Sequence, residues 1–184
     1  MTLYHGSPTE GLTQLMPSLS EHNKSYIYFS ANPVVALLYA VKPVPKPFSF
    51  YPYGFDSDGT VVYSEYYKNA FENIYKGKVG YLYECDNVTD TGNPTQISCA
   101  YTVTEPVEIN RVTEIADCYE QFKEYENQGL FRIKPFENIS ANEMKIVTDD
   151  FENYIQKYDL RNKPDNEMSI FIKTKFPCIW DVKK

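Results

Sequence analysis

The sequence predicts an α+β fold with a mostly antiparallel sheet and flanking helices. Short β-branched and aromatic runs are interspersed with helical patterns, and no internal repeat links them. The chain has 184 residues, 42% of them hydrophobic and 16% aromatic, which is enough apolar material for one real core. We therefore expect a single domain over residues 1–184.

Charge and composition exclude several classes of partner. Eighteen Lys and Arg against 25 Asp and Glu leave a formal net charge of −7, so general binding to nucleic acid or to anionic membranes is not expected. No run approaches the ~20 apolar residues of a membrane span. The first residues lack the basic and apolar regions of an export signal, so we expect a cytoplasmic protein.

The cysteines give no sign of a metal site or a reactive thiol. All four are scattered without a CxxC pair, and only His5 and His22 are available as imidazole ligands. Nothing around the cysteines suggests the basic setting that lowers a thiol pKa. We expect no bound metal.

The first third of the chain predicts strand, turn and helix. Residues 3–5 and 25–29 are predicted strands. Asn32 has the character of a helix N-cap and Pro33 that of a first helical residue, and the apolar run 34–41 predicts a buried helix. Residues 42–59 contain four prolines and many rings, which predicts a loop.

The remaining elements follow from short apolar runs and from helix signals. Asp117 marks the start of one helix and Gly129 its end. The predicted helices are 63–75, 117–128 and 149–158, and the predicted strands are 79–85, 97–104, 107–115, 130–133, 144–147 and 169–173.

Two N-terminal segments carry candidate binding chemistry. Ten residues separate Tyr28 from Tyr39, so a strand followed by a helix reverses the chain between them and lets both rings face one slot. Two rings suit a flat heteroaromatic, and a cation such as nicotinamide gains further from their faces. The imidazole of His5 can bond a ribose hydroxyl, and the bare backbone of Gly6 can approach an amide closely.

These residues resemble the ADP-ribosyltransferase fold of the diphtheria-toxin and poly(ADP-ribose) polymerase type. That family pairs a His-Gly on its first core strand with a Tyr-x10-Tyr over a strand and helix; here these are His5-Gly6 and Tyr28 to Tyr39. The resemblance covers roughly the first 41 residues and implies a split, mostly antiparallel sheet with NAD as substrate. The branch with an arginine on its first core strand is excluded, because the first arginine here is Arg111.

The resemblance also implies roles for individual residues. His5 would hold the adenosine-side ribose, the backbone of Gly6 would bond the nicotinamide carboxamide, and Tyr28 and Tyr39 would sandwich the ring. Further members of the implied site are Ser7 at the same strand end, Ser30 near the pocket and the loop 42–59 over NAD.

The catalytic glutamate of that family has no clear counterpart. A carboxylate bonded to the ribose 2′-OH stabilises the oxocarbenium character that develops when the glycosidic bond breaks. The segment 98–103 matches best by order, and Ala100 stands where the acid is expected. Glu105 is a displaced substitute; Glu143, within 142–147, matches better locally but lies late in the strand order.

Three functions remain open on these residues. The first is an NAD-dependent mono-ADP-ribosyltransferase-like protein that releases nicotinamide and modifies an unidentified macromolecular or small-molecule acceptor, with His5 and Glu105 as catalytic residues. The second is a degenerate member of the same fold that binds a nucleotide or a protein partner without turnover. The third is a partner-binding domain without a nucleotide site, in which His5 is structural and the rings of 48–55 pack on the core.

Overall fold

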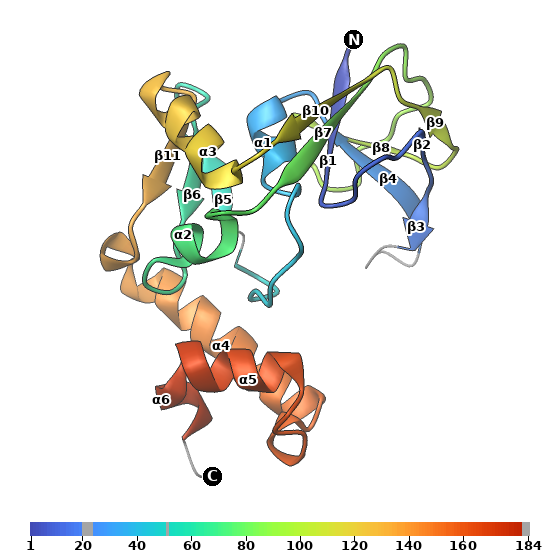
Figure 1. Ribbon diagram of the computed structural model, residues 1–184. Helices are drawn as coiled ribbons and strands as arrows, with labels where there is room; N and C mark the ends of the chain where they lie inside the picture. Colours follow the sequence, from blue (N-terminus) through green and yellow to red (C-terminus); the bar gives the residue numbers. More distant parts are fainter. Residues whose placement is uncertain (20–23, 51, 182–184) are drawn as a thin grey trace. The chain divides into compact units, whose positions relative to one another are not determined.

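A computed structural model describes residues 1–19, 24–50 and 52–181 (Figure 1). The chain is α+β with mostly antiparallel sheets, as predicted. It divides into two compact units, which are described separately. The first unit holds Met1–Pro43 and Ile74–Phe131, and the second holds Val44–Asn73 and Arg132–Lys184. One domain over the whole chain stays a prediction, and His22 lies outside the described residues.

The first unit is built on one antiparallel sheet (Figure 1). Its strand order is β10-β7-β1-β4-β3, with β8 paired to β4, and a separate ribbon pairs β2 with β9. The strands are β1 (Leu3–Ser7), β2 (Gln14–Leu15), β3 (Ser18–Leu19), β4 (Ser25–Ser30), β7 (Gly80–Cys85), β8 (Ala100–Val103), β9 (Val107–Glu108) and β10 (Arg111–Ile115).

The two central strands, β1 and β4, pair only briefly. All five residues of β1 pair with β7, but within the described residues Tyr4 opposite Ser30 is the one paired position between β1 and β4. The start of β4 pairs with β3 instead, and Ile27 to Ser30 pair with β8 on the other edge. From His5 onward the two strands therefore separate, and we refer to this feature as the strand separation.

One helix, α1 (Pro33–Leu37), packs against β1, β4 and β7. Asn32 caps it by accepting a hydrogen bond from the Val34 N–H, and Pro33 occupies its first turn, as predicted. The helix is shorter than the predicted 34–41, because residues 38–40 form turns. The other face of the sheet carries a core cluster of Leu3, Leu15, Ile27, Phe29, Cys85 and Val103.

A second helix of this unit, α3 (Cys118–Asn127), confirms the prediction for 117–128. The Asp117 side chain accepts from two backbone N–H groups at its start. Gly129 follows its end with a φ of 73°, the left-handed conformation that glycine adopts at helix ends. Phe122 anchors α3 in the core, where its ring lies 5.1 Å from that of Tyr75.

The second unit combines a three-stranded sheet with a helical segment. Its sheet order is β11-β6-β5, and β5 and β6 are antiparallel. The elements are β5 (Tyr53–Phe55), β6 (Val61–Ser64), α2 (Ala70–Tyr75), β11 (Phe131–Lys134), η1 (Phe136–Asn138), α4 (Ala141–Lys157), η2 (Leu160–Asn162), α5 (Glu167–Lys175) and α6 (Pro177–Trp180). The last two residues of α2, Ile74 and Tyr75, and the first of β11, Phe131, fall in the first unit.

Three predictions in this unit are wrong. The expected helix 63–75 is a strand up to Ser64 and a helix only from Ala70. The expected strands 144–147 and 169–173 lie inside α4 and α5. A run of four or five apolar residues fits a buried strand and a half-buried helix equally well, and here helix caps at Ser140 and Asn166 decide for the helix.

Residues 42–59 are tied into the second unit by their own contacts. Phe50 is buried with its ring 6.2 Å from that of Tyr66, whose hydroxyl donates to the Pro45 oxygen at 2.8 Å. The Ser49 N–H and hydroxyl both donate to Asp150. These contacts favour the packing alternative; a role of this segment over NAD stays a prediction.

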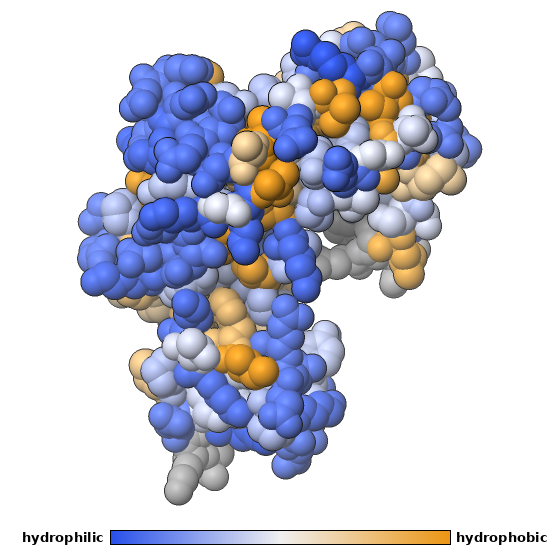
Figure 2. Space-filling view, in the orientation of Figure 1, coloured by the Kyte–Doolittle hydropathy of each residue, from blue (hydrophilic) through white to orange (hydrophobic). Residues whose placement is uncertain are grey.

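The surface in view is mainly hydrophilic, with hydrophobic atoms gathered in patches (Figure 2). Across the described residues, no helix combines the length and the apolar character needed to cross a membrane.

Candidate functional site

His5 lies at the strand separation and reaches across it. Its Nδ1 donates a hydrogen bond of 2.8 Å to the backbone oxygen of Tyr28. Because a carbonyl oxygen only accepts, the proton sits on Nδ1, and Nε2 keeps its lone pair when the ring is neutral. Burial lowers the pKa of His5, and the bond to Tyr28 opposes this only in part. At neutral pH the ring thus offers an acceptor that suits a hydroxyl group.

The side chains of His5 and Tyr28 lie on different faces of the sheet. His5 alternates with Gly6 along β1 and packs edge-on against Phe29, with ring centroids 6.1 Å apart. Tyr28 alternates with Phe29 and thus projects to the face that α1 covers. The two side chains therefore offer their contacts on opposite faces of the sheet.

Gly6 is a glycine because α1 packs directly on it. A Cβ at this position would lie 1.9 Å from the Ala36 oxygen and 3.0 Å from the Ala40 nitrogen. The Tyr39 N–H donates to that same Ala36 oxygen at 3.0 Å. The structure thus brings the backbones of Gly6 and Tyr39 together, and the Tyr39 side chain is 52% exposed. Contact of the Gly6 backbone with a carboxamide stays a prediction.

The two predicted serines shape the turns beside the strand separation. Ser7 is buried at the end of β1, and its hydroxyl oxygen accepts from the Thr9 N–H at 3.1 Å. Ser30 is buried at the end of β4, and its hydroxyl oxygen accepts from the Asn32 N–H at 3.0 Å. Each side chain therefore fixes the turn after a strand that borders the site.

Glu105 follows β8, the strand that pairs with β4. Thr102 of β8 faces Tyr28, and Ala100 faces Ser30. Glu105 is exposed and lies in a bend just after the end of β8 at Val103. Its catalytic role stays a prediction, and the position expected for the acid carries the methyl group of Ala100.

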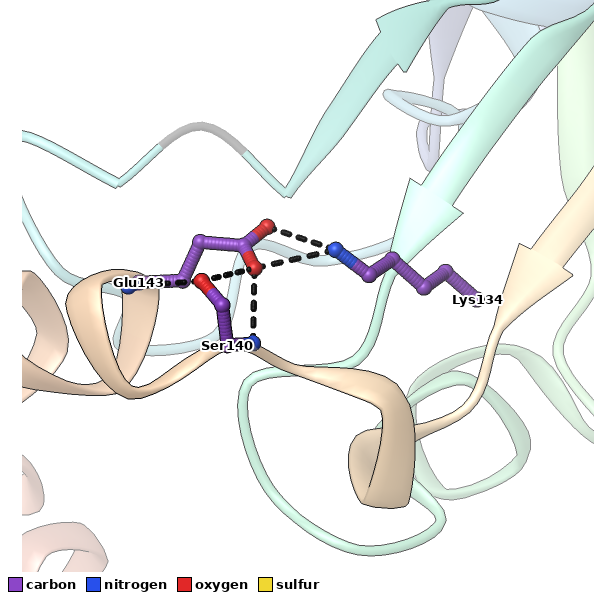
Figure 3. A network of polar contacts seen from close by, with 3 residues as sticks. All are labelled: Lys134, Ser140 and Glu143. Carbon is purple, nitrogen blue, oxygen red and sulfur yellow. Dashed lines mark hydrogen bonds and ion pairs between the residues drawn. The ribbon is translucent and has the colours of Figure 1, made fainter.

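Glu143 belongs to the second unit and caps a helix instead of lying on a strand. Figure 3 shows its carboxylate between the ammonium of Lys134 on β11 and Ser140 at the start of α4. Its oxygens lie 2.8 and 2.9 Å from Lys134 Nζ, and the Ser140 N–H donates to it at 2.8 Å. The bonds to Lys134 and Ser140 lower the pKa of Glu143 to about 2. The local match of 142–147 to a strand motif is therefore wrong.

Sequence reasoning missed a group of side chains that shares the face of His5. Tyr83 pairs with His5 across β1 and β7, and its buried hydroxyl donates to the Thr9 oxygen at 2.6 Å and accepts from the Leu12 N–H at 3.3 Å. This places the loop that carries Glu10 over the same face. The residue pattern of 79–85 predicts a strand, but no feature of the sequence indicates that this strand pairs with β1.

No family model, no curated protein and no solved structure matches this chain. Among the residues that the structure describes, no three His, Cys, Asp or Glu side chains group as metal ligands.

Proposed function

We propose that the first unit binds NAD at the strand separation and acts as an NAD-dependent mono-ADP-ribosyltransferase-like protein. The observation that carries the proposal is the bond from His5 to the Tyr28 backbone where β1 and β4 stop pairing. It holds an imidazole with its proton on Nδ1 beside an aromatic residue, at the place where the backbone pairing of β1 and β4 has ended.

The other residues fit the two ends of a dinucleotide. Tyr28 and the helix that ends before Tyr39 share one side of the sheet, which suits a nicotinamide ring between two phenol rings. His5 approaches from the other face, where its Nε2 accepts from a ribose hydroxyl. An extended NAD molecule that passes between β1 and β4 contacts both faces.

The proposed reaction breaks the bond between ribose C1′ and the nicotinamide nitrogen. The electron pair leaves with nicotinamide, which becomes neutral, and an acceptor oxygen or nitrogen forms the new bond to C1′ and gives up its proton. The acidic first unit gives no general attraction for nucleic acid, so the acceptor remains open among proteins and small molecules.

The test uses the purified full-length chain with NAD. We expect nicotinamide release above a buffer blank and a rise in Tm with NAD concentration. In Tyr39→Ala we expect the rate of release to fall at least tenfold and the same rise in Tm to need at least tenfold more NAD. Tyr158→Ala, at a tyrosine of similar exposure in the second unit, is the matched control. Release equal to the blank, with no effect of Tyr39→Ala on any NAD response, refutes the transferase.

A second candidate function is nucleotide binding without turnover. Ala100 opposite Ser30 favours it, because a methyl group cannot stabilise positive charge on ribose. It predicts stabilisation by NAD, about 2.7 kcal/mol at 100 times Kd, with no nicotinamide released. If NAD neither binds nor reacts, the remaining candidate is a partner-binding domain that uses its Tyr-rich surface as a protein interface.

A further inference from the structure

The strand β10 lies at one edge of the sheet of the first unit, beside β7 (Figure 1). Within the described residues, no strand pairs with its outer side. Four of its five residues, from Arg111 to Glu114, are exposed, and the side chain of Val112 is 50% exposed. The strand contains no proline that would block a neighbour. An exposed edge of this kind is a template for pairing with another strand.

The backbone groups of Val112 and Glu114 point away from β7. The Glu84 oxygen accepts from the Asn110 N–H at 2.9 Å, so the backbone groups of Glu84 point toward β10, where Arg111 lies opposite. Residues along an antiparallel strand bond alternately to the neighbour on one side and on the other. Because Arg111 bonds to β7, Val112 and Glu114 direct their N–H and C=O groups to the outer side.

The charge at this edge is negative. Arg111 is the one cation of the strand, and its guanidinium is bound by Glu84 of β7 at 2.6 Å. Glu114 is exposed on the other face, opposite Tyr81. The first unit as a whole holds six of the 18 Lys and Arg and twelve of the 25 Asp and Glu, which gives a net charge of −6. A strand that adds here therefore gains from positive charge.

We propose that β10 accepts an extended basic segment of a partner protein as an additional antiparallel strand. Every described strand pair of this sheet is antiparallel, so we expect the same direction for the added strand. A Lys or Arg of the segment lies opposite Glu114, and an apolar residue two positions later lies opposite Val112, on the same face of the sheet. This interaction does not depend on the proposed binding of NAD.

A second copy of the chain is a less suitable occupant of this edge. In an antiparallel pair of two β10 strands, Glu114 lies opposite Asn110 or Val112, depending on the register. Neither residue offers a cation, and two units that each carry a net charge of −6 repel one another. A basic segment satisfies both the outward backbone groups and the carboxylate.

The test measures binding of a fluorescein-labelled peptide with the core Lys-Thr-Val-Thr to the purified full-length chain. Fluorescence anisotropy is recorded at about 0.15 M salt, where charges more than about 8 Å apart are largely screened. We expect a Kd below about 1 mM. Glu114→Lys should weaken this peptide about fivefold or more and should strengthen a peptide with glutamate in place of the lysine. Glu124→Lys makes the same change of charge on α3, and we expect it to alter the Kd less than about twofold.

Val112→Pro tests the pairing of the backbone. It removes an N–H that points outward and leaves the bonds between β10 and β7, so we expect a folded protein that binds the peptide about tenfold or more weakly. Amide exchange gives a readout on the wild-type chain. The peptide should protect the N–H groups of Val112 and Glu114 and leave the exchange of Arg111 and Thr113, which face β7, unchanged.

Peptide binding that both Glu114→Lys and Val112→Pro weaken, with protection of the outward N–H groups, supports the added strand. Binding that either substitution leaves unchanged, or a Kd above about 1 mM, overturns it. A dimer in sedimentation velocity that Val112→Pro converts to a monomer assigns the edge to a second copy and overturns the basic segment as its occupant.

Discussion

His5 and Tyr28 are joined by an imidazole-to-backbone bond of 2.8 Å at the position where the ladder between β1 and β4 ends. At this position a hydrogen bond from a side chain replaces the backbone pairing of the two strands. It keeps β1 and β4 connected where their backbones separate. We therefore expect the stability of the first unit, and the proposed binding of NAD to it, to depend on the same ring.

The protonation of His5 predicts a pH dependence of stability. Burial lowers the folded-state pKa of His5 below its ordinary 6.5, so between these two values the unfolded chain holds more protons than the folded one. Stability is then full above about pH 6.5 and falls as the pH drops through this window. Urea unfolding of wild type and His5→Gln from pH 5 to 7.5 checks this, because glutamine keeps an N–H donor but does not titrate. Parallel pH curves for the two proteins would contradict the expectation.

Gly6→Ala should strongly destabilise the first unit. The new Cβ would meet the Ala36 oxygen at 1.9 Å, and backbone atoms of α1 cannot yield as a flexible side chain can. We expect a loss of about 3 kcal/mol or more in the free energy of unfolding, measured by urea denaturation. Gly54→Ala is the control, since nothing lies within 4 Å of a Cβ there, and it should cost less than about 1 kcal/mol. Similar costs for both variants would show that α1 moves away freely.

The cap at the start of α4 predicts a second, more acidic transition. Glu143 has an ordinary pKa of 4.5 and a folded-state pKa of about 2, so its contribution is present above pH 4.5 and is lost as the pH falls toward 2. Glu143→Gln should remove this part of the acid sensitivity, and Ser140→Ala should cost about 1 kcal/mol at neutral pH. Glu137→Gln is the control, because Glu137 is exposed and its ion pair with Lys68, at 3.9 Å on the surface, contributes little to stability. An acid midpoint equal in wild type and Glu143→Gln would contradict this account.

The hydrogen bonds of Glu65 predict that replacing its carboxylate by an amide destabilises the protein. Its buried carboxylate accepts from the Phe71 N–H at 3.0 Å and from the Phe136 N–H at 3.3 Å. In Glu65→Gln one oxygen becomes an NH₂ group that faces an N–H donor, so a buried donor loses its acceptor. We expect a loss of about 1–3 kcal/mol in the free energy of unfolding, with Glu137→Gln again as the control. A Tm within about 1 °C of wild type would rule this out.

Much of the first unit was predictable because its signals are local. Asn32 before Pro33 fixed a helix start, Asp117 and Gly129 bounded a helix, and the runs 25–29 and 79–85 are strands in the structure. The failures are also local in origin: the strands expected at 144–147 and 169–173 are helices, although Ser140 and Glu143 have the spacing of a capping box. A short apolar run has no period of its own to choose between the two structures.

The sequence by itself determined where α1 and α3 begin and which strand precedes α1, and it made His5, Gly6, Tyr28 and Tyr39 the candidate site residues. Only the tertiary structure decided that Gly6 serves helix packing, that His5 and Tyr28 present opposite faces, and that Tyr83 pins the loop of Glu10 beside them. The reason is physical: caps and turns are set by neighbours in the chain, whereas the pairing of β1 with β7 joins residues 74 to 82 positions apart and is fixed by burial that no local pattern specifies.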